Sequence, residues 1–306
     1  MTFTLILEQT FNGLQAGVTL FLVAAGLTLI LGIMDFVFLA HGSQVMIGAY
    51  AAAAITLATG NFYLGVLLAI PVTFVSGYLL EYLIIRHLYR RDHMEQVLAT
   101  FGLILFFNEA IRVSFGPAAL FSDLPPSLSG FVEILPAMPY PAYRLGVIIV
   151  GLLCAVGIHL LVSRTRIGAM VRAGANNPEM TAALGINIKT LFRFIFATGA
   201  CLAGVAGMML GPLTAVQPGM GEPLLILSLV VIIIGGIGSV RGAFVAAIIV
   251  GLVDTLGRVF LPAILRLFVE QATADGAGPA LASMLVYILM AVVLIFRPTG
   301  LFPAKG

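Results

Sequence analysis

Apolar stretches long enough to cross a membrane alternate with short polar segments along most of the chain. A transmembrane helix needs roughly 20 apolar residues to span the hydrocarbon layer of a bilayer. The alternation therefore predicts one all-α, polytopic membrane domain over residues 1–306, with about eight or nine transmembrane helices. The expected spans cover residues 11–33, 36–59, 64–85, 96–115, 145–162, 194–213, 224–237, 243–259 and 280–296.

Two of these spans are expected to be broken or to cross only half of the membrane. The span at 36–59 begins with polar side chains, and the span at 224–237 is short and ends in a glycine-rich turn. Lipid cannot bond the backbone groups that a break frees, so both breaks should face protein or a cavity. Paired broken helices in the two halves of a transporter point to a central translocation site. The candidate pathway residues are His41, Gly42, Ser43, Gln44, Gly235, Gly236 and Gly238.

The polar side chains at the first break also have a purely structural interpretation. His41 and Gln44 would then bond carbonyl groups that the break leaves unpaired. The sequence leaves both interpretations open. Because no second His, Cys or carboxylate lies at ligand spacing, no metal site is expected.

Basic residues cluster in a few polar segments, and this sets the expected topology. By the positive-inside rule, the segments at 86–93 and 164–193 and the C-terminus with Arg297 and Lys305 are cytoplasmic. The segment at 116–143 contains several prolines and no Lys or Arg, so it is expected to be external and without a regular helix. We also expect an external turn at 217–223 and an external amphipathic segment at 261–278.

The cytoplasmic segment at 164–193 contains the signals of a short helix at about 178–184. Asn177 is a favourable N-cap, Pro178 suits the first helical position, and Gly185 suits the position after the last. Glu179 lies beside the positive end of the helix dipole. A helix of about two turns is unstable alone, so another span or another subunit must cover its apolar side. That side consists of Met180, Ala183 and Leu184.

Composition and charge exclude other classes of protein. The chain is 61% hydrophobic and 9% charged, whereas a soluble domain is roughly 25% charged. It contains no catalytic triad pattern and no phosphate-binding loop, so no catalytic residue is expected and any ATP must be hydrolysed by another chain.

Two charge pairs within the spans, Asp254 with Arg258 and Glu109 with Arg112, have spacings that allow mutual neutralisation. This disfavours the alternative of an ion-gradient-driven secondary transporter or channel for a small polar solute.

Five motifs in the same order resemble the permease subunits of bacterial branched-chain amino-acid ABC importers. They extend over nearly the whole chain, and the first is similar to the H-type subunit. Their sequences are LAHGSQVMIGAY at 39–50, RTRIGAMVRA at 164–173, AALGIN at 182–187, GGIGSVRGA at 235–243 and RPTGL at 297–301.

The resemblance implies a permease in the bacterial inner membrane that works within a larger assembly. The implied partners are an M-type permease, two ATPase subunits that use ATP and Mg, and an extracytoplasmic substrate-binding protein. The chain itself would bind no cofactor. The helix at 178–184 would be the coupling helix that fits a groove of one ATPase. Phe38 and Leu39 replace the Asn-Phe that is usual in the family, so the resemblance does not imply specificity for leucine alone. The substrate is expected to be a branched-chain amino acid or a related small amino acid or amide.

Overall fold

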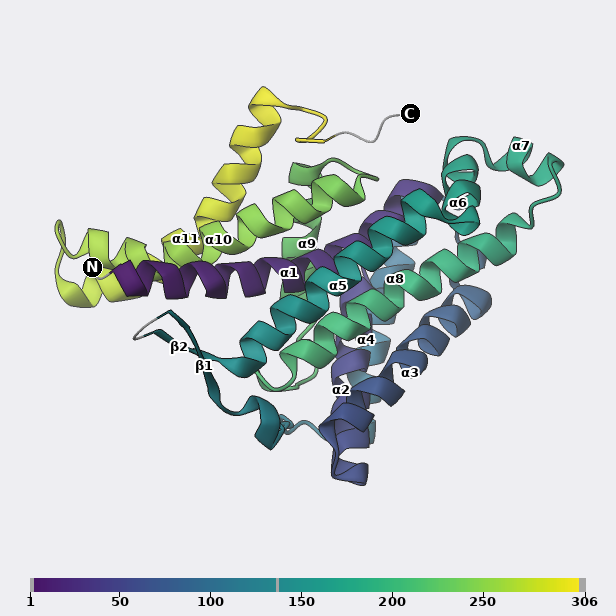
Figure 1. The fold of residues 1–306 in the computed structure, drawn as a ribbon. Helices are drawn as coiled ribbons and strands as arrows, with labels where there is room; N and C mark the ends of the chain where they lie inside the picture. The colour runs from purple at the N-terminus through teal and green to yellow at the C-terminus, as the bar shows by residue number, and fades with distance from the viewer. Residues whose placement is uncertain (1–2, 136–137, 303–306) are drawn as a thin grey trace.

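The computed structural model describes residues 3–135 and 138–302, which form a bundle of long helices (Figure 1). Within these residues, eight helices are long and apolar enough to cross a membrane. They are α1 (Phe3–Met34), α2 (His41–Thr59), α3 (Phe62–Leu83), α4 (His93–Phe115), α5 (Ala142–Arg164), α8 (Ile188–Leu210), α10 (Val240–Leu265) and α11 (Gln271–Phe296). A shorter apolar helix, α9 (Glu222–Gly235), lies among them. The predicted all-α, polytopic fold is confirmed.

Short elements connect the spans. The helices α6 (Arg166–Asn176) and α7 (Pro178–Ala183) form the polar segment before α8, and two 3-10 turns cover Ile85–His87 and Pro126–Leu128. The strands β1 (Phe131–Leu135) and β2 (Met138–Pro141) pair antiparallel, with Val132 opposite Tyr140. Among the described residues of the segment at 116–143 there is no α-helix before α5 begins at Ala142, as expected, but its hairpin was not predicted.

Side-chain caps fix where several helices begin. The Asn61 amide oxygen accepts hydrogen bonds from the backbone N–H groups of Tyr63 and Leu64, at 2.9 and 3.2 Å, and begins α3. The Asp92 carboxylate accepts one from Glu95, at 2.8 Å, and begins α4. Such residues satisfy N–H groups that have no partner within the helix. These caps are local, so the sequence predicts the starts of both spans well.

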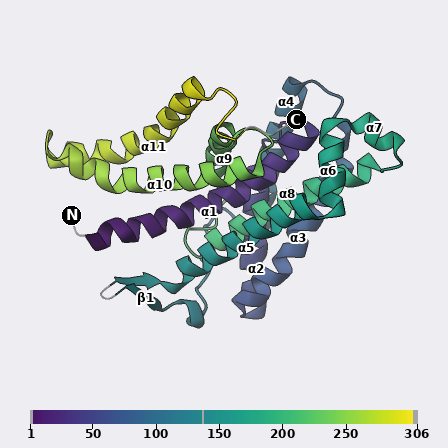
Figure 2. The same cartoon turned by 45° about the horizontal axis from the view of Figure 1, so that its top comes forward.

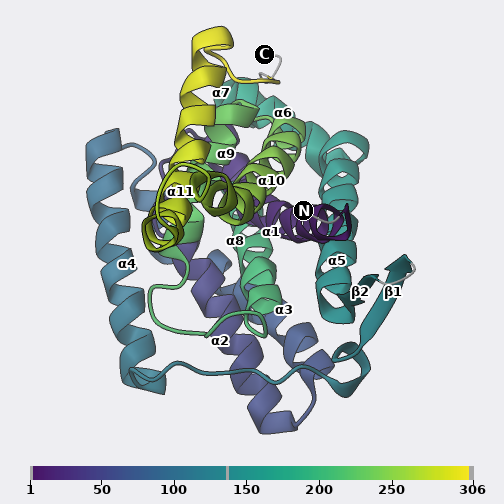
Figure 3. The ribbon, with the colours of Figure 1, turned by 90° about the vertical axis from the view of Figure 1, so that its left-hand side faces the viewer.

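The centre of the bundle is α1, which lies between α10 and α5 in two views and also packs on α8 (Figures 2 and 3). Small residues allow this close packing. A Cβ atom on Gly17 would come within 2.8 Å of the Ala247 carbonyl oxygen of α10, and one on Gly48 of α2 within 2.5 Å of the Gly204 Cα atom of α8. Larger residues at either position would separate the helices.

The expectation for residues 261–278 was wrong. Instead of one amphipathic segment, these residues are divided between the end of α10 and the start of α11, with a turn at 266–270. The Arg266 guanidinium pairs with the Asp275 carboxylate across this turn, at 2.7 Å. The polar side chains that suggested a separate segment therefore join the ends of two spans.

Candidate functional site

The chain enters α2 through a non-helical segment, residues 35–40, that is held by side chains of α4. The Gln96 amide oxygen accepts a hydrogen bond from the Val37 N–H at 3.2 Å, and the Thr100 hydroxyl accepts one from the Leu39 N–H at 3.4 Å. Gln96 and Thr100 lie one helical turn apart and are both buried. They supply the partners that lipid cannot provide, so a break can exist here inside the bundle.

The polar residues that begin α2 are buried but incompletely paired. The His41 Nε2 atom lies 3.1 Å from the Val23 carbonyl oxygen of α1, and the Gln44 amide oxygen accepts a hydrogen bond from Ser76 at 3.2 Å. Neither His41 Nδ1 nor Gln44 Nε2 has a partner among the described residues. Buried polar atoms without partners are rare and call for an explanation such as a ligand or an ordered water. The carbonyl that His41 contacts belongs to the intact helix α1. It is not one of the carbonyl groups that the break before α2 leaves unpaired.

The start of α9 lies beside the start of α2. A Cβ atom on Gly42 would come within 2.6 Å of the Gly221 carbonyl oxygen, so the two backbones are in direct contact. The next residue, Glu222, has an exposed side chain, and its carboxylate accepts a hydrogen bond from Asn108 of α4 at 2.7 Å. Asn108 precedes the end of α4 at Phe115 by seven residues, or about 10 Å along the helix axis. Glu222 therefore lies beside α4 about two turns inside the end of this candidate span.

The expected turn at 217–223 is present at residues 218–221, but it lies against the start of α2, since Gly221 contacts Gly42. Glu222 was not among the predicted site residues. The available signal was Pro223 directly after Glu222, since an acidic residue and a proline are both typical of the first turn of a helix.

The glycines at the second break lie at the other end of α9, one helix of 14 residues away, or about 20 Å. Gly236 and Gly238 have φ angles of 103° and 81°, which favour glycine. The C-terminal segment holds this turn, with hydrogen bonds from the Leu301 and Phe302 N–H groups to the Ile234 and Gly235 carbonyls at 2.8 and 3.0 Å. The structure therefore does not bring the two predicted groups of pathway residues together.

The short helix α7 has the predicted caps. The Asn177 amide oxygen accepts a hydrogen bond from the Met180 N–H at 2.9 Å, and Gly185 has a φ of 87°. Its apolar side chains do not pack on the bundle: Met180 is 61% exposed and Leu184 is 76% exposed. The described spans therefore do not cover them. Figure 1 shows α6 and α7 projecting beyond the ends of the spans.

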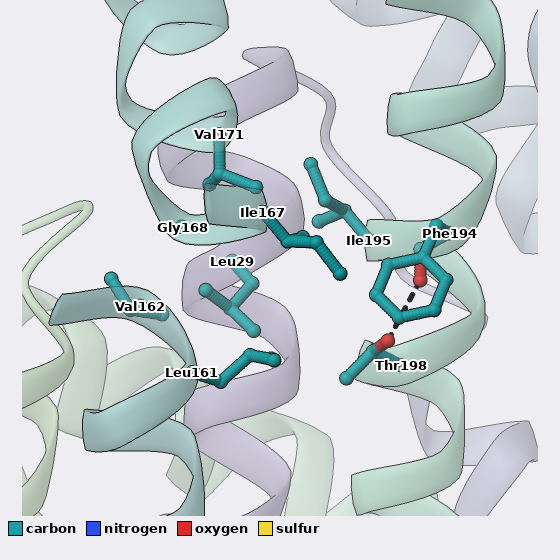
Figure 4. A pocket seen from close by; sticks show the side chains of 9 residues that line it. All are labelled: Leu29, Leu161, Val162, Ile167, Gly168, Val171, Phe194, Ile195 and Thr198. Carbon is teal, nitrogen blue, oxygen red and sulfur yellow. Dashed lines mark hydrogen bonds between the residues drawn. The ribbon is translucent and has the colours of Figure 1, made fainter. Parts of the chain in front are cut away.

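The helix α6 joins this projection to the bundle. Ile167 and Val171 of α6 face Leu29 of α1 and Ile195 of α8 around an apolar cavity of about 20 Å³ (Figure 4). A cavity of this size is barely large enough for one water molecule, so the contact is nearly closed. The helix α6 therefore packs directly on α1 and α8.

A buried ion pair joins α8 to α3 at the same end of the bundle. The Arg193 Nε atom lies 2.9 Å from a carboxylate oxygen of Glu81, which is 1% exposed. Tyr89 donates a hydrogen bond to the other carboxylate oxygen at 3.1 Å. Burial and the Glu81 charge raise the pKa of the Tyr89 hydroxyl above its ordinary value, so it remains a donor. Arg193 was predicted only to mark a cytoplasmic segment, and this network was not predicted.

Comparison with known proteins identifies the family. Residues 9–294 match the model of a family described as the branched-chain amino acid transport system permease component. The chain belongs to this family. The permease is 30% identical to the high-affinity branched-chain amino acid transport system permease protein BraD of Pseudomonas aeruginosa, over 96% of this chain and 95% of that protein.

Two further relatives agree. The permease protein LivH of Escherichia coli K12 is 26% identical over 98% of this chain and 96% of its own. The probable branched-chain amino acid transport permease protein LivH of Methanocaldococcus jannaschii is 28% identical over 92% of this chain and 88% of its own. No solved structure matches the permease significantly.

Both predicted charge pairs of the permease form. Arg258 bonds Asp254 at 2.9 Å, and Arg112 bonds Glu109 at 3.0 Å. Each is a pair within one helix, which is a low-cost way to hold charges at a membrane. These pairs and the family both disfavour a transporter driven by an ion gradient.

Proposed function

We propose that this permease translocates branched-chain amino acids, or related small amino acids and amides, as part of an ATP-driven importer. The family match over residues 9–294 carries the proposal. The exposed apolar side chains of α7 support it, because an ATPase subunit would cover them. In this proposal α7 is the coupling helix, formed by Asn177, Pro178, Glu179, Met180, Ala183, Leu184 and Gly185.

The proposed assembly contains an M-type permease, two ATPase subunits and an extracytoplasmic binding protein, in a bacterial inner membrane. The ATPases use ATP and Mg, and this chain performs no chemistry. Its C-terminus is proposed to be cytoplasmic, as is the end of the bundle that carries α6 and α7. Arg297, at the end of α11, supports this side, while Lys305 lies outside the described residues.

The proposed mechanism is a shift between outward-facing and inward-facing populations. ATP binding closes the ATPases, which move α7. The contacts of α6 with α1 and α8 transmit this movement, and the Glu81–Arg193 pair extends it to α3. Glycines at both ends of α9 let its backbone approach those of α2 and α10 closely. In this mechanism the packing of these helices rearranges between the outward-facing and inward-facing states.

Reconstitution in proteoliposomes tests the proposal. The permease with its ATPases, partner permease and binding protein is expected to take up labelled leucine only with ATP and Mg. Uptake of labelled urea or a short amide in place of leucine would change the substrate but keep the mechanism. Uptake by this chain alone, driven by a proton or sodium gradient, would contradict an ATP-driven importer.

The pathway is proposed to pass the adjacent starts of α2 and α9. His41, Gly42, Ser43 and Gln44 line or support it there, with Glu222 as the charged group. A carboxylate exposed at membrane depth is costly unless it faces a polar path or a partner. Glu222 would bind the ammonium group of a substrate.

Glu222→Gln is accordingly expected to reduce leucine uptake about tenfold or more, because a hydrogen bond to a charged group contributes roughly 1.5–3 kcal/mol. Initial uptake rates over a range of substrate concentrations measure the effect. Glu109→Gln is the matched control, since its carboxylate pairs with Arg112 on the same helix. Equal uptake by both variants would exclude Glu222 from substrate binding.

A further inference from the structure

A cavity of about 750 Å³ opens at the end of the bundle that carries α6 and α7. Its walls are the last turns of α1 and α5, the helix α6, the turn between α9 and α10, and residues 301–302. It lies beyond the small apolar cavity of Figure 4, with which it shares Leu29, Val162 and Val171. It is far larger than the space left by imperfect packing, so it can hold a molecular group.

The charged residues that line this cavity are both basic. Arg172 of α6 and Arg241 of α10 line it, and no Asp or Glu is among its lining residues. Both arginine side chains are exposed. Arg241 also lies in the first turn of α10, whose free N–H groups add partial positive charge. The cavity therefore favours an anion.

A buried polar group lies beneath the wall of the cavity. Thr28 of α1 is among the lining residues and is 1% exposed, and its hydroxyl has no hydrogen-bond partner among the described residues. The hydroxyl oxygen is itself enclosed, so it does not face the open space of the cavity. The two arginines are therefore the charged groups that a ligand in the cavity can reach.

We propose that this cavity binds the phosphate-bearing headgroup of an anionic phospholipid. Basic pockets between helices at the cytoplasmic face of a membrane are suited to such headgroups. Arg241 would bond the phosphate oxygens from one side, and Arg172, whose Nη1 atom also donates to the Val162 carbonyl oxygen, would bond them from the other. The lipid would join α6, and through it α7, to α10, and so would stabilise the connection between the proposed coupling helix and the spans.

Lipid-dependent thermal stability tests the site. The full-length permease, purified in a zwitterionic detergent, is titrated with mixed micelles of phosphatidylglycerol or of phosphatidylcholine while its unfolding temperature is followed. Phosphatidylglycerol is expected to stabilise the wild type, and phosphatidylcholine is not. The Arg172→Gln/Arg241→Gln variant is expected to require at least tenfold more phosphatidylglycerol.

The matched control is Arg164→Gln/Arg166→Gln, which removes the same charge from the same end of the bundle at residues that do not line the cavity. Its response to phosphatidylglycerol is expected to equal that of the wild type. Equal losses in both double variants would indicate general attraction to the basic surface and would overturn the proposal. A response unchanged in the Arg172→Gln/Arg241→Gln variant would overturn it as well.

A further measurement defines the ligand. Inorganic phosphate is the other source of the same chemistry. Stabilisation of the wild type by millimolar phosphate, equal to that by phosphatidylglycerol, would assign the cavity to a soluble anion and overturn the lipid proposal.

Discussion

Leu184→Glu is expected to lower ATP-driven leucine uptake by roughly thirtyfold while leaving the amount of permease in the membrane unchanged. Leu184 is 76% exposed, so the substitution removes little contact within the permease. If α7 fits an apolar groove of an ATPase, a buried carboxylate there would cost as much as the loss of a binding hot spot, about 2 kcal/mol or more. Uptake and ATP hydrolysis by the same proteoliposomes measure the effect.

Leu267→Glu is the matched control, because Leu267 is 78% exposed in the turn between α10 and α11, far from α7 (Figure 1). It should retain transport.

Ala183→Glu should uncouple hydrolysis from transport as Leu184→Glu does. Gly185→Leu tests the cap, since its φ of 87° costs a residue with a side chain about 1–2 kcal/mol. Wild-type coupling in all three α7 variants would exclude α7 as the contact with the ATPase.

The spans and α7 could be predicted because their signals are local. Hydrocarbon thickness requires a minimum length of apolar chain, and Asn177 and Gly185 mark helix ends through their own backbone neighbours. The same holds for the polar start of α2 at His41. The roles proposed for these residues still depend on partners.

Contacts between distant segments could not be predicted. Glu81 and Arg193 are 112 residues apart in sequence, and Gly221 contacts Gly42 only because the chain after α8 turns back into the bundle. The helix α6 was also missed, although Thr165 caps it by accepting a hydrogen bond from the Gly168 N–H at 3.0 Å. Its glycines and basic residues resemble a loop, and its stability comes from packing on α1 and α8.

The buried ion pair between α3 and α8 gives the second large effect. Arg193→Met is expected to destabilise the permease by about 3–5 kcal/mol, because it leaves the Glu81 carboxylate buried without its cation. The remaining hydrogen bond from Tyr89 cannot compensate a full charge. Unfolding in increasing SDS, followed by circular dichroism, measures the loss.

The double variant Glu81→Gln/Arg193→Met separates charge from packing. Removing both charges eliminates the unpaired carboxylate, so it is expected to recover most of the stability lost in Arg193→Met. If the pair also transmits the movement of α7 to α3, the stable double variant should still hydrolyse ATP but transport less leucine per ATP than the wild type. Recovery of both stability and coupling would limit the pair to a structural role. The Arg193 guanidinium also packs on Tyr78 and Tyr82, 5.1 and 4.8 Å from their ring centres. A double variant no more stable than Arg193→Met would show that this packing, and not the charge of Arg193, holds α8 against α3.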